Sequence, residues 1–318
     1  MVRGDTRPTE YMNAPSKGSP PETRHIRPID VVSVVYLVLV LILILVFHRN
    51  LKPWWLYAIA HLAGIAVVVA LARVNPNNAS GATRFLRDWY STALFLACYE
   101  EAGWLNHLVG NKTHEWLPIA WDKAIFGDQP SLEFSRRLTS PLFAEYMSLS
   151  YMSFYVMIMV FALALYLRPD REPFADYIFR ATLTFFFCFL IFILFPTVGP
   201  QYVFADEPGR PLQGKVFGAL LRLIFRFGEV QNGALPSSHC AVSLVVLLSA
   251  RLYKSRLFWP LMVLTASLWV STVYIRSHYF VDVPAGLIIG AAFFFYIAPK
   301  TRALLSTHLA RHNAVAGS

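Results

Sequence analysis

Residues 31–47 read VVSVVYLVLVLILILVF, an apolar run without a charged side chain. Its length approaches the ~20 residues that a helix needs to cross the ~30 Å hydrocarbon core of a bilayer. No small-residue cleavage site follows the run, so it predicts a retained membrane helix rather than the core of a signal peptide. The preceding residues 1–29 are polar and rich in Pro, Arg, Thr and Ser. They predict a disordered cytoplasmic tail.

Apolar segments of similar length recur along the whole chain. Of the 318 residues, 56% are hydrophobic and 15% are charged, whereas soluble domains carry roughly 25% charged residues. This composition predicts an all-α fold, a polytopic membrane helix bundle of about eight spans. After the first span, we expect the others at residues 54–72, 89–109, 144–167, 174–195, 235–253, 257–274 and 279–298.

The formal net charge of +9 has a simple explanation in a membrane protein. Lys and Arg are more frequent in the segments on one side of the predicted spans, which by the positive-inside rule places both termini in the cytoplasm. We therefore attribute the positive charge to membrane-flanking loops that lie near anionic lipid headgroups, and we expect no nucleic-acid partner. The cysteines, Cys98, Cys188 and Cys240, form no C-x-x-C pair, and neither a disulfide framework nor a zinc site is expected.

Two long loops lie on the predicted outer side. Residues 110–143 contain Trp116, Trp121 and the stretch WDKAIFGDQP, and their aromatic and charged residues predict an interfacial helix. Residues 196–234 begin PTVGPQYVF, where Gly and Pro interrupt any helix. Their basic residues are compatible with either a plain surface loop or the wall of an anion site.

Residues 235–244, LPSSHCAVSL, mark the start of an apolar helix. Ser237 is a good N-cap, and Pro236 helps to set the helix start. Free backbone N–H groups and the helix dipole make such a start an anion site, and His239 would point from the first turn toward the anion. The alternative is a Ser cap followed by an incidental interfacial histidine.

Residues 271–286, STVYIRSHYFVDVPAG, place His278 and Asp282 four residues apart, on one face of a helix. The carboxylate can accept a hydrogen bond from one imidazole nitrogen, which fixes the tautomer and leaves the other nitrogen free to attack. Ionisable groups at the edge of an apolar span are functional candidates. The alternative is a structural His–Asp pair that closes a helix end.

The predicted topology puts both histidines on the outer face, because His239 begins the sixth span and His278 follows the seventh. Two imidazoles, a carboxylate, a helix N-terminus and nearby cations suit phosphoryl transfer through a phosphohistidine. One histidine would attack phosphorus, the other would protonate the leaving oxygen, and cations would neutralise the remaining oxygens.

The motifs Pro236-Ser237-Ser238-His239 and Ser271 through His278 to Asp282 resemble the second and third motifs of the type-2 phosphatidic acid phosphatase superfamily. The resemblance covers about two-thirds of the chain. It implies that His278 is the nucleophile, that Asp282 orients it and that His239 is the general acid. Ser237 and Ser238 would hold phosphate, and neither a metal nor a cofactor is implied. It also implies a six-helix core.

The first motif of that superfamily is not intact. Arg210 precedes Pro211 in the expected loop, but Val203 occupies the lysine position. Thr272 stands where the third motif has arginine, and Arg276 follows four residues later, on the same face of a continuing helix. We therefore expect Arg276, Arg210 and Lys215 to bind the phosphate.

These departures, with Tyr274, Gly199-Pro200 and the D-x-x-x-F-G-x-x-P pattern from Asp122 to Pro130, resemble the inositol phosphorylceramide synthase branch. Gln201 departs from that branch, which has arginine after Gly-Pro. The branch implies transfer of a phospho-headgroup to a lipid hydroxyl rather than to water. The domains expected are residues 1–29, a tail, 30–83, two accessory transmembrane helices, 84–298, the catalytic core, and 299–318, a cytoplasmic tail.

The function expected is that of an integral membrane lipid phosphatase or phosphotransferase acting on a phospholipid or a prenyl-phosphate type substrate within the bilayer. Its site would face the periplasm, the cell exterior or an organelle lumen. The alternative is a non-catalytic lipid transporter or scramblase that keeps the fold. A soluble vanadate-type haloperoxidase shares the motifs but not the run of spans. The sequence leaves the oligomeric state open.

Overall fold

The computed structural model describes residues 26–75, 78–207, 214–228 and 230–316. In this part of the chain the regular structure is helical, and no β-strand is present. An isolated bridge joins Thr197 and Gly233. The prediction of an all-α fold is confirmed, whereas most of the expected N-terminal tail and Arg210 lie outside the described residues.

Among the described residues, five helices are long and apolar enough to cross a membrane. The first two coincide closely with the first two predicted spans, and the last is a continuous helical segment, Asp282–Arg311, that includes a π-helical turn. The length and composition of these helices are typical of an integral membrane protein. The five are α1 (Pro28–Val46), α2 (Trp54–Ala72), α6 (Pro141–Tyr166), α7 (Glu172–Leu194) and the segment formed by α12 (Asp282–Ala292), η2 (Phe293–Ile297) and α13 (Ala298–Ala316).

Helices also occupy the other three predicted spans, but they do not meet the same criteria. α10 (Ser238–Leu252) and α11 (Phe258–Tyr274) are apolar but shorter. α3 (Gly81–Trp104) begins before the predicted residues 89–109, because Ser80 caps it by accepting a hydrogen bond from the Thr83 N–H. Its first turns then include Arg84 and Arg87, which lower its apolar character. The total of eight spans remains a prediction.

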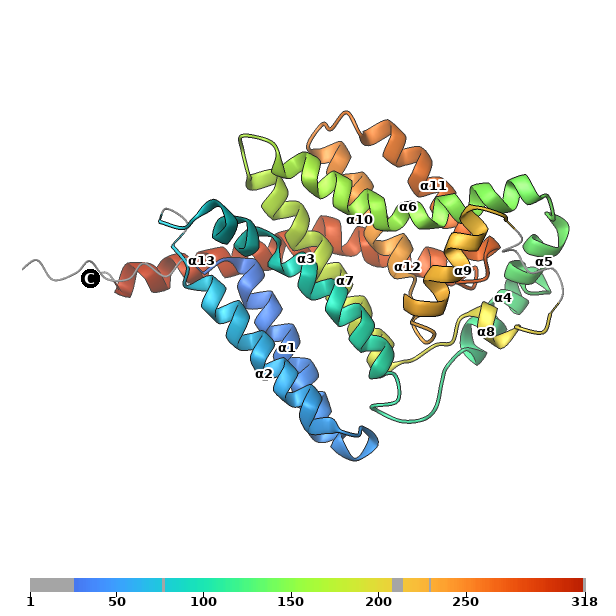
Figure 1. Cartoon of the computed structure of the whole chain (residues 1–318), viewed down its shortest axis with the longest axis horizontal. Helices are drawn as coiled ribbons and strands as arrows, with labels where there is room; N and C mark the ends of the chain where they lie inside the picture. Colours follow the sequence, from blue (N-terminus) through green and yellow to red (C-terminus); the bar gives the residue numbers. More distant parts are fainter. Residues whose placement is uncertain (1–25, 76–77, 208–213, 229, 317–318) are drawn as a thin grey trace, which may run out of the picture.

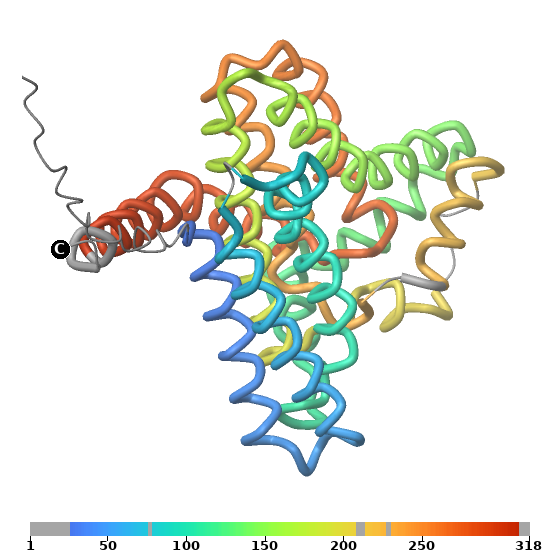
Figure 2. Tube along the Cα trace, turned by 60° about the vertical axis from the view of Figure 1, so that its left-hand side comes forward, coloured from blue at the N-terminus to red at the C-terminus, as the bar shows by residue number. Residues whose placement is uncertain are grey.

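The helices form a bundle with short helices gathered at one end (Figure 1). α10 lies inside, in contact with α6, α7, α11 and α12, while α1 pairs with α2. The short helices α4 (Trp116–Phe126), α5 (Pro130–Arg137), α8 (Pro200–Val203) and α9 (Phe217–Gly228) lie away from α13. Figure 2 shows α13 projecting from the opposite side of the bundle. The segment predicted as a C-terminal tail, residues 299–318, is therefore helical as far as Ala316.

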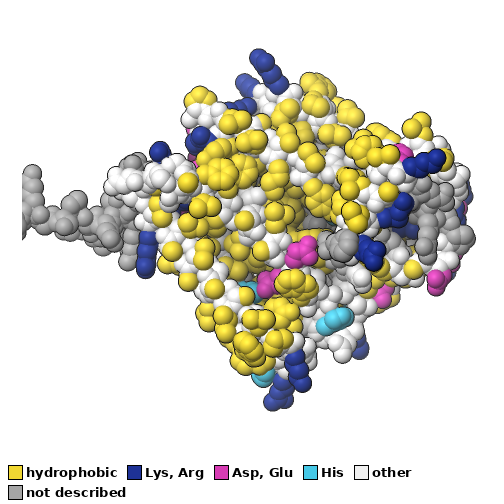
Figure 3. Space-filling view, in the orientation of Figure 1, with side chains coloured by type: hydrophobic (Ala, Val, Ile, Leu, Met, Phe, Trp, Pro, Cys, Tyr) yellow, Lys and Arg dark blue, Asp and Glu magenta, His cyan; other side chains and the backbone are white. Residues whose placement is uncertain are grey.

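The long helices expose many large hydrophobic side chains, as expected of helices that face lipid. Figure 3 shows hydrophobic side chains over most of the visible face, with Lys and Arg mainly toward its edges. On α1, the exposed side chains Val35, Leu39, Ile42 and Val46 recur at helical spacing. Such a stripe indicates the lipid-facing side of α1.

Two glycines allow α12 to lie directly against α10. A Cβ atom built on Gly286 would lie 2.3 Å from the backbone oxygen of Ser237, and one on Gly290 would lie 2.5 Å from that of Ala241. Real Cβ atoms do not approach so closely, so only glycine fits at both positions. This close packing brings the start of α10 beside the start of α12.

Candidate active site

His278 lies in the turn between α11 and α12. The backbone N–H groups of Ser277 and His278 both donate to the Thr272 carbonyl, each at 3.1 Å, which closes the end of α11. Between these helices Arg276 adopts a left-handed conformation with φ 64°, and this reverses the chain direction. The reversal directs the His278 ring into the protein, where it is 2% exposed.

The two nitrogens of the His278 ring have different environments. Nδ1 lies 2.7 Å from the carbonyl oxygen of Ala234 and 3.5 Å from the Asp282 carboxylate. Because a carbonyl oxygen only accepts hydrogen bonds, Nδ1 must carry the proton, and Nε2 then holds a lone pair. Nε2 lies 3.3 Å from Nδ1 of His239. His278 is therefore held in the tautomer that a nucleophile requires.

His239 stands in the first turn of α10, beside α6. Its ring centroid lies 4.7 Å from that of Tyr151 and 4.4 Å from that of Phe154. The Tyr151 hydroxyl in turn lies 3.0 Å from the hydroxyl of Ser277, next to His278. Among the described residues, His239 Nε2 is buried without a hydrogen-bond partner. The aromatic rings thus fix this imidazole with its Nδ1 toward His278.

The Ala234 carbonyl is positioned by a short backbone pairing. The Ala234 N–H donates to the Thr197 carbonyl at 3.0 Å, and the Thr197 N–H donates to the Asn232 carbonyl at 2.9 Å. Gly199 continues this segment, where an added Cβ would lie 3.0 Å from the Ser277 oxygen. The loop that begins PTVGP therefore lines the pocket beside His278, and its role as the wall of an anion site remains a prediction.

The helix start expected to bind an anion lies at this site. The Ser237 side chain accepts a hydrogen bond from the Cys240 N–H at 3.2 Å, as an N-cap does. Ser238 lines a pocket of about 20 Å³ together with His239, His278, Ser277 and Gln201. That volume suffices for about one water molecule, which needs roughly 10–15 Å³.

Asp282, the first residue of α12, is fully buried beside His278. Its Oδ2 accepts a hydrogen bond from the Tyr279 N–H at 2.8 Å, and its backbone carbonyl accepts one from the Ser237 N–H at 3.2 Å. Asp282 thus links the turn that carries His278 to the cap of α10.

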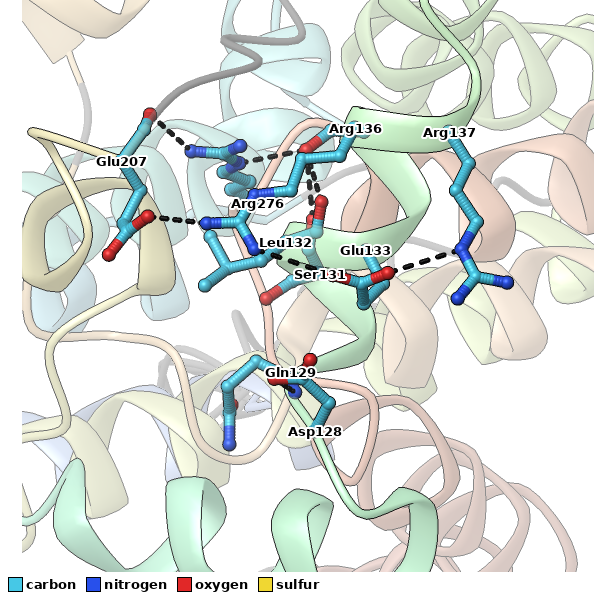
Figure 4. Close-up of polar contacts among 10 residues, drawn as sticks. Asp128, Gln129, Ser131, Leu132, Glu133, Arg136, Arg137, Glu207 and Arg276 are labelled. Carbon is cyan, nitrogen blue, oxygen red and sulfur yellow. Dashed lines mark hydrogen bonds and ion pairs between the residues drawn. The ribbon is translucent and has the colours of Figure 1, made fainter.

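Of the cations expected to bind phosphate, the two described ones, Arg276 and Lys215, do not line this pocket. The prediction for Arg276 assumed a continuing helix, but α11 ends at Tyr274, so spacing by four residues does not place Arg276 over the site. Its guanidinium instead donates to the Ser135 hydroxyl at 2.9 Å and to the Glu207 carbonyl at 3.3 Å (Figure 4). Lys215 is exposed, and Arg210 lies outside the described residues. Their role in phosphate binding remains a prediction.

Sequence reasoning missed two groups that hold His278 in place. The first is the Ala234 carbonyl, a main-chain atom for which no residue pattern exists. The second is Asp122 of α4, whose carboxylate accepts hydrogen bonds from the N–H groups of Phe280 and Val281 at 2.9 and 3.1 Å. Burial raises the pKa of the Asp122 carboxyl above its ordinary value, and the two backbone donors act in the opposite direction. The D-x-x-x-F-G-x-x-P pattern carried a signal for Asp122 but not its role.

A cluster of His, Cys, Asp and Glu side chains could also hold a metal ion. Among them, no group of three or more His, Cys, Asp and Glu side chains is arranged to hold a metal ion. His239, His278 and Asp282 lie together, but Nδ1 of His278 and Oδ2 of Asp282 bond the backbone, and His278 Nε2 faces His239 Nδ1.

Comparison with protein families gives one match. The family model described as the PAP2 superfamily matches residues 119–296, more than half of the chain. The chain belongs to the PAP2 superfamily. The matched region of this PAP2 protein contains His239, His278 and Asp282, and it suggests a phosphatase-type enzyme. Comparisons with curated proteins and with solved structures gave no match.

Proposed function

We propose that this PAP2 protein breaks a phosphate ester of a lipid in the membrane through a phosphohistidine on His278. The observation that carries the proposal is the pair of imidazoles, with His278 Nε2 3.3 Å from His239 Nδ1 while His278 Nδ1 is engaged by Ala234. This arrangement places a nucleophilic nitrogen beside a proton-carrying imidazole, so that both can act on the same phosphate ester. The helix start at Ser238 supplies N–H groups for the phosphate oxygens.

In the first step, the Nε2 lone pair of His278 attacks phosphorus and the bond from phosphorus to the lipid oxygen breaks. Protonated His239 donates its Nδ1 proton to the leaving oxygen, which departs as an alcohol. The Ala234 carbonyl and the Asp282 carboxylate stabilise the positive charge that develops on the His278 ring. The products are the lipid alcohol and phosphorylated His278.

In the second step, neutral His239 accepts a proton from the incoming hydroxyl group, whose oxygen attacks phosphorus. The bond from phosphorus to Nε2 breaks, and its electron pair returns to His278. Water as the acceptor gives a phosphatase, and a lipid hydroxyl gives a phosphotransferase. The residues from Asp122 to Pro130 and Gly199-Pro200 support the second acceptor through their resemblance to the inositol phosphorylceramide synthase branch.

The proposal includes a position in the membrane. We place the site on the non-cytoplasmic face, in a core formed by α3, α6, α7, α10, α11 and α12, with α1 and α2 as accessory helices. The excess of Lys and Arg in the segments on the other side supports this orientation. The short helices α4, α5, α8 and α9 would then lie at the outer surface.

The acceptor is tested with purified protein in mixed lipid vesicles. We expect conversion of a lipid phosphate ester. Mass spectrometry of the lipid products and an assay of released inorganic phosphate measure this conversion. Phosphate release identifies water as acceptor, and a labelled headgroup on a second lipid identifies transfer. Lipid movement between leaflets with no altered lipid, unchanged in His239→Ala and His278→Ala proteins, would instead indicate a scramblase.

Asp282→Asn is expected to lower activity less than removal of the His278 imidazole does. The Ala234 carbonyl is the closer partner of His278 Nδ1, at 2.7 Å against 3.5 Å for Asp282, so the tautomer survives the substitution. The loss of charge is expected to lower kcat by about 10–100-fold, the range measured for carboxylates that orient metal-bound histidines, because the tautomer itself is kept. Steady-state kinetics measure the effect. A loss as large as that of His278→Ala would contradict the role of the Ala234 carbonyl.

A further inference from the structure

One face of α4 lies against the turn that carries His278. Asp122 is fully buried, and its two carboxylate oxygens each accept one hydrogen bond, from the N–H groups of Phe280 and Val281. These residues lie between the nucleophile and Asp282. The hydrogen bonds therefore connect a helix far away in sequence to the short segment that orients the attacking imidazole.

The hydrogen bonds complete a set in the turn before α12. Residues 279–281 precede the helix, so its internal hydrogen bonds do not pair their N–H groups, and leaving a buried N–H group unpaired costs free energy. Asp282 accepts from the Tyr279 N–H at 2.8 Å, and Asp122 accepts from the next two residues at 2.9 and 3.1 Å. Two carboxylates thus hold every backbone N–H between His278 and Asp282.

Apolar contacts from α4 reinforce this arrangement. Ile119 packs against the buried cluster of Ala234, Tyr279 and Val281, which includes the residue whose carbonyl holds His278 Nδ1. The Phe126 ring lies 4.7 Å from that of Phe280, at an angle of 73°. Because Ile119, Asp122 and Phe126 recur at helical spacing, one face of α4 makes all these contacts.

Gly127 explains how α4 ends beside the turn. It adopts φ 78°, a left-handed conformation in which glycine is free of the Cβ penalty. Its N–H donates to the Lys123 carbonyl at 2.8 Å, and Pro130 then begins α5. Each fixed position of the D-x-x-x-F-G-x-x-P pattern therefore either contacts the nucleophile turn or shapes the helices beside it.

We propose that Asp122 is a positioning residue of the reaction. It acts through the backbone of residues 279–281 and holds the His278 ring so that Nε2 faces the phosphorus and His239. The inference rests on the proposed function, since it assigns a role within the step that forms the phosphoenzyme. Asp122 makes no contact with the reacting atoms, so its removal slows attack without weakening substrate binding.

Two substitutions and a matched control test this role in the full-length protein. Asp122→Asn keeps the shape and one acceptor oxygen, and Asp122→Ala removes both acceptors. We expect the rate of phosphoenzyme formation to fall about 10-fold and about 100-fold respectively, by analogy with the range for groups that orient metal ligands from the outer shell. KM and the rate of phosphoenzyme breakdown should stay unchanged. Asp128→Asn is the control, because within the described structure this exposed carboxylate bonds only the neighbouring Gln129 N–H.

The readouts separate this inference from the proposed function. Normal rates in Asp122→Asn, together with an inactive His278→Ala protein, would overturn the inference and leave the function standing. Full activity in His278→Ala would overturn both. If Asp122→Ala does not fold, Asp122→Asn decides. A lower yield of folded Asp122→Asn protein with normal phosphoenzyme formation per folded molecule would assign Asp122 to folding and contradict the positioning role.

Discussion

His278→Ala is expected to abolish the phosphoenzyme and to lower turnover by at least about 10⁴-fold. The substitution removes Nε2, the only imidazole lone pair that the hydrogen bonds of the described site direct toward His239. Tyr279 and Asp282 keep their own backbone contacts, so the turn has other interactions to preserve its shape. Radiolabelled lipid phosphate and rapid quenching measure both quantities.

His308→Ala is a suitable control for this result. His308 is an exposed residue of α13, so the same substitution there leaves turnover unchanged. The thermal unfolding midpoints of both variants should match that of the unsubstituted protein. Labelled phosphoenzyme in the His278→Ala protein would mean that another residue is the nucleophile.

Gly286→Ala is expected to have the largest effect on stability. The added Cβ would lie 2.3 Å from the Ser237 backbone oxygen and 3.0 Å from the Cys240 Cβ. A backbone oxygen cannot rotate away as a flexible side chain does, so α12 must move from α10. Overpacking of this kind costs about 1–3 kcal/mol, and the displacement moves Ser237 and His239 relative to His278. Both the thermal unfolding midpoint and the catalytic rate should fall.

Gly81→Ala provides the comparison for Gly286→Ala. A Cβ on Gly81 meets nothing within 4 Å, and alanine favours the helix that begins there. The thermal unfolding midpoint of the Gly81→Ala protein in detergent should equal or exceed that of the unsubstituted protein. An equally stable and active Gly286→Ala protein would show that α10 and α12 do not pack as closely as the structure has them.

Much of the helix layout follows from local sequence. The predicted segment 54–72 coincides with α2, and the predicted 257–274 differs from α11 by one residue at its start. Apolar runs determine such helices, because burial and lipid contact act on every residue of the run. α3 was less predictable, since its cap at Ser80 extends the helix into a polar stretch.

The site was predictable only in part, for reasons of geometry. The motif spacing, and the two predicted spans that separate the histidines, were sufficient to expect His239 near His278. They did not identify the Ala234 carbonyl as a partner of His278. They also did not identify the hydrogen bond to Asp122 from the Phe280 N–H, which lies more than 150 residues further along the chain. The placement of Arg276 depends on a left-handed residue after the end of α11, and helical periodicity does not apply there.

The central claim is that His278 attacks phosphorus through Nε2. The most direct measurement traps the phosphoenzyme from a labelled lipid phosphate and locates the phosphate by mass spectrometry and by the identity of the phosphohistidine isomer. We predict phosphate on Nε2 of His278, because Nδ1 is engaged by the Ala234 carbonyl at 2.7 Å. Phosphate on Nδ1 of His278, on His239 or on any other residue would contradict the mechanism.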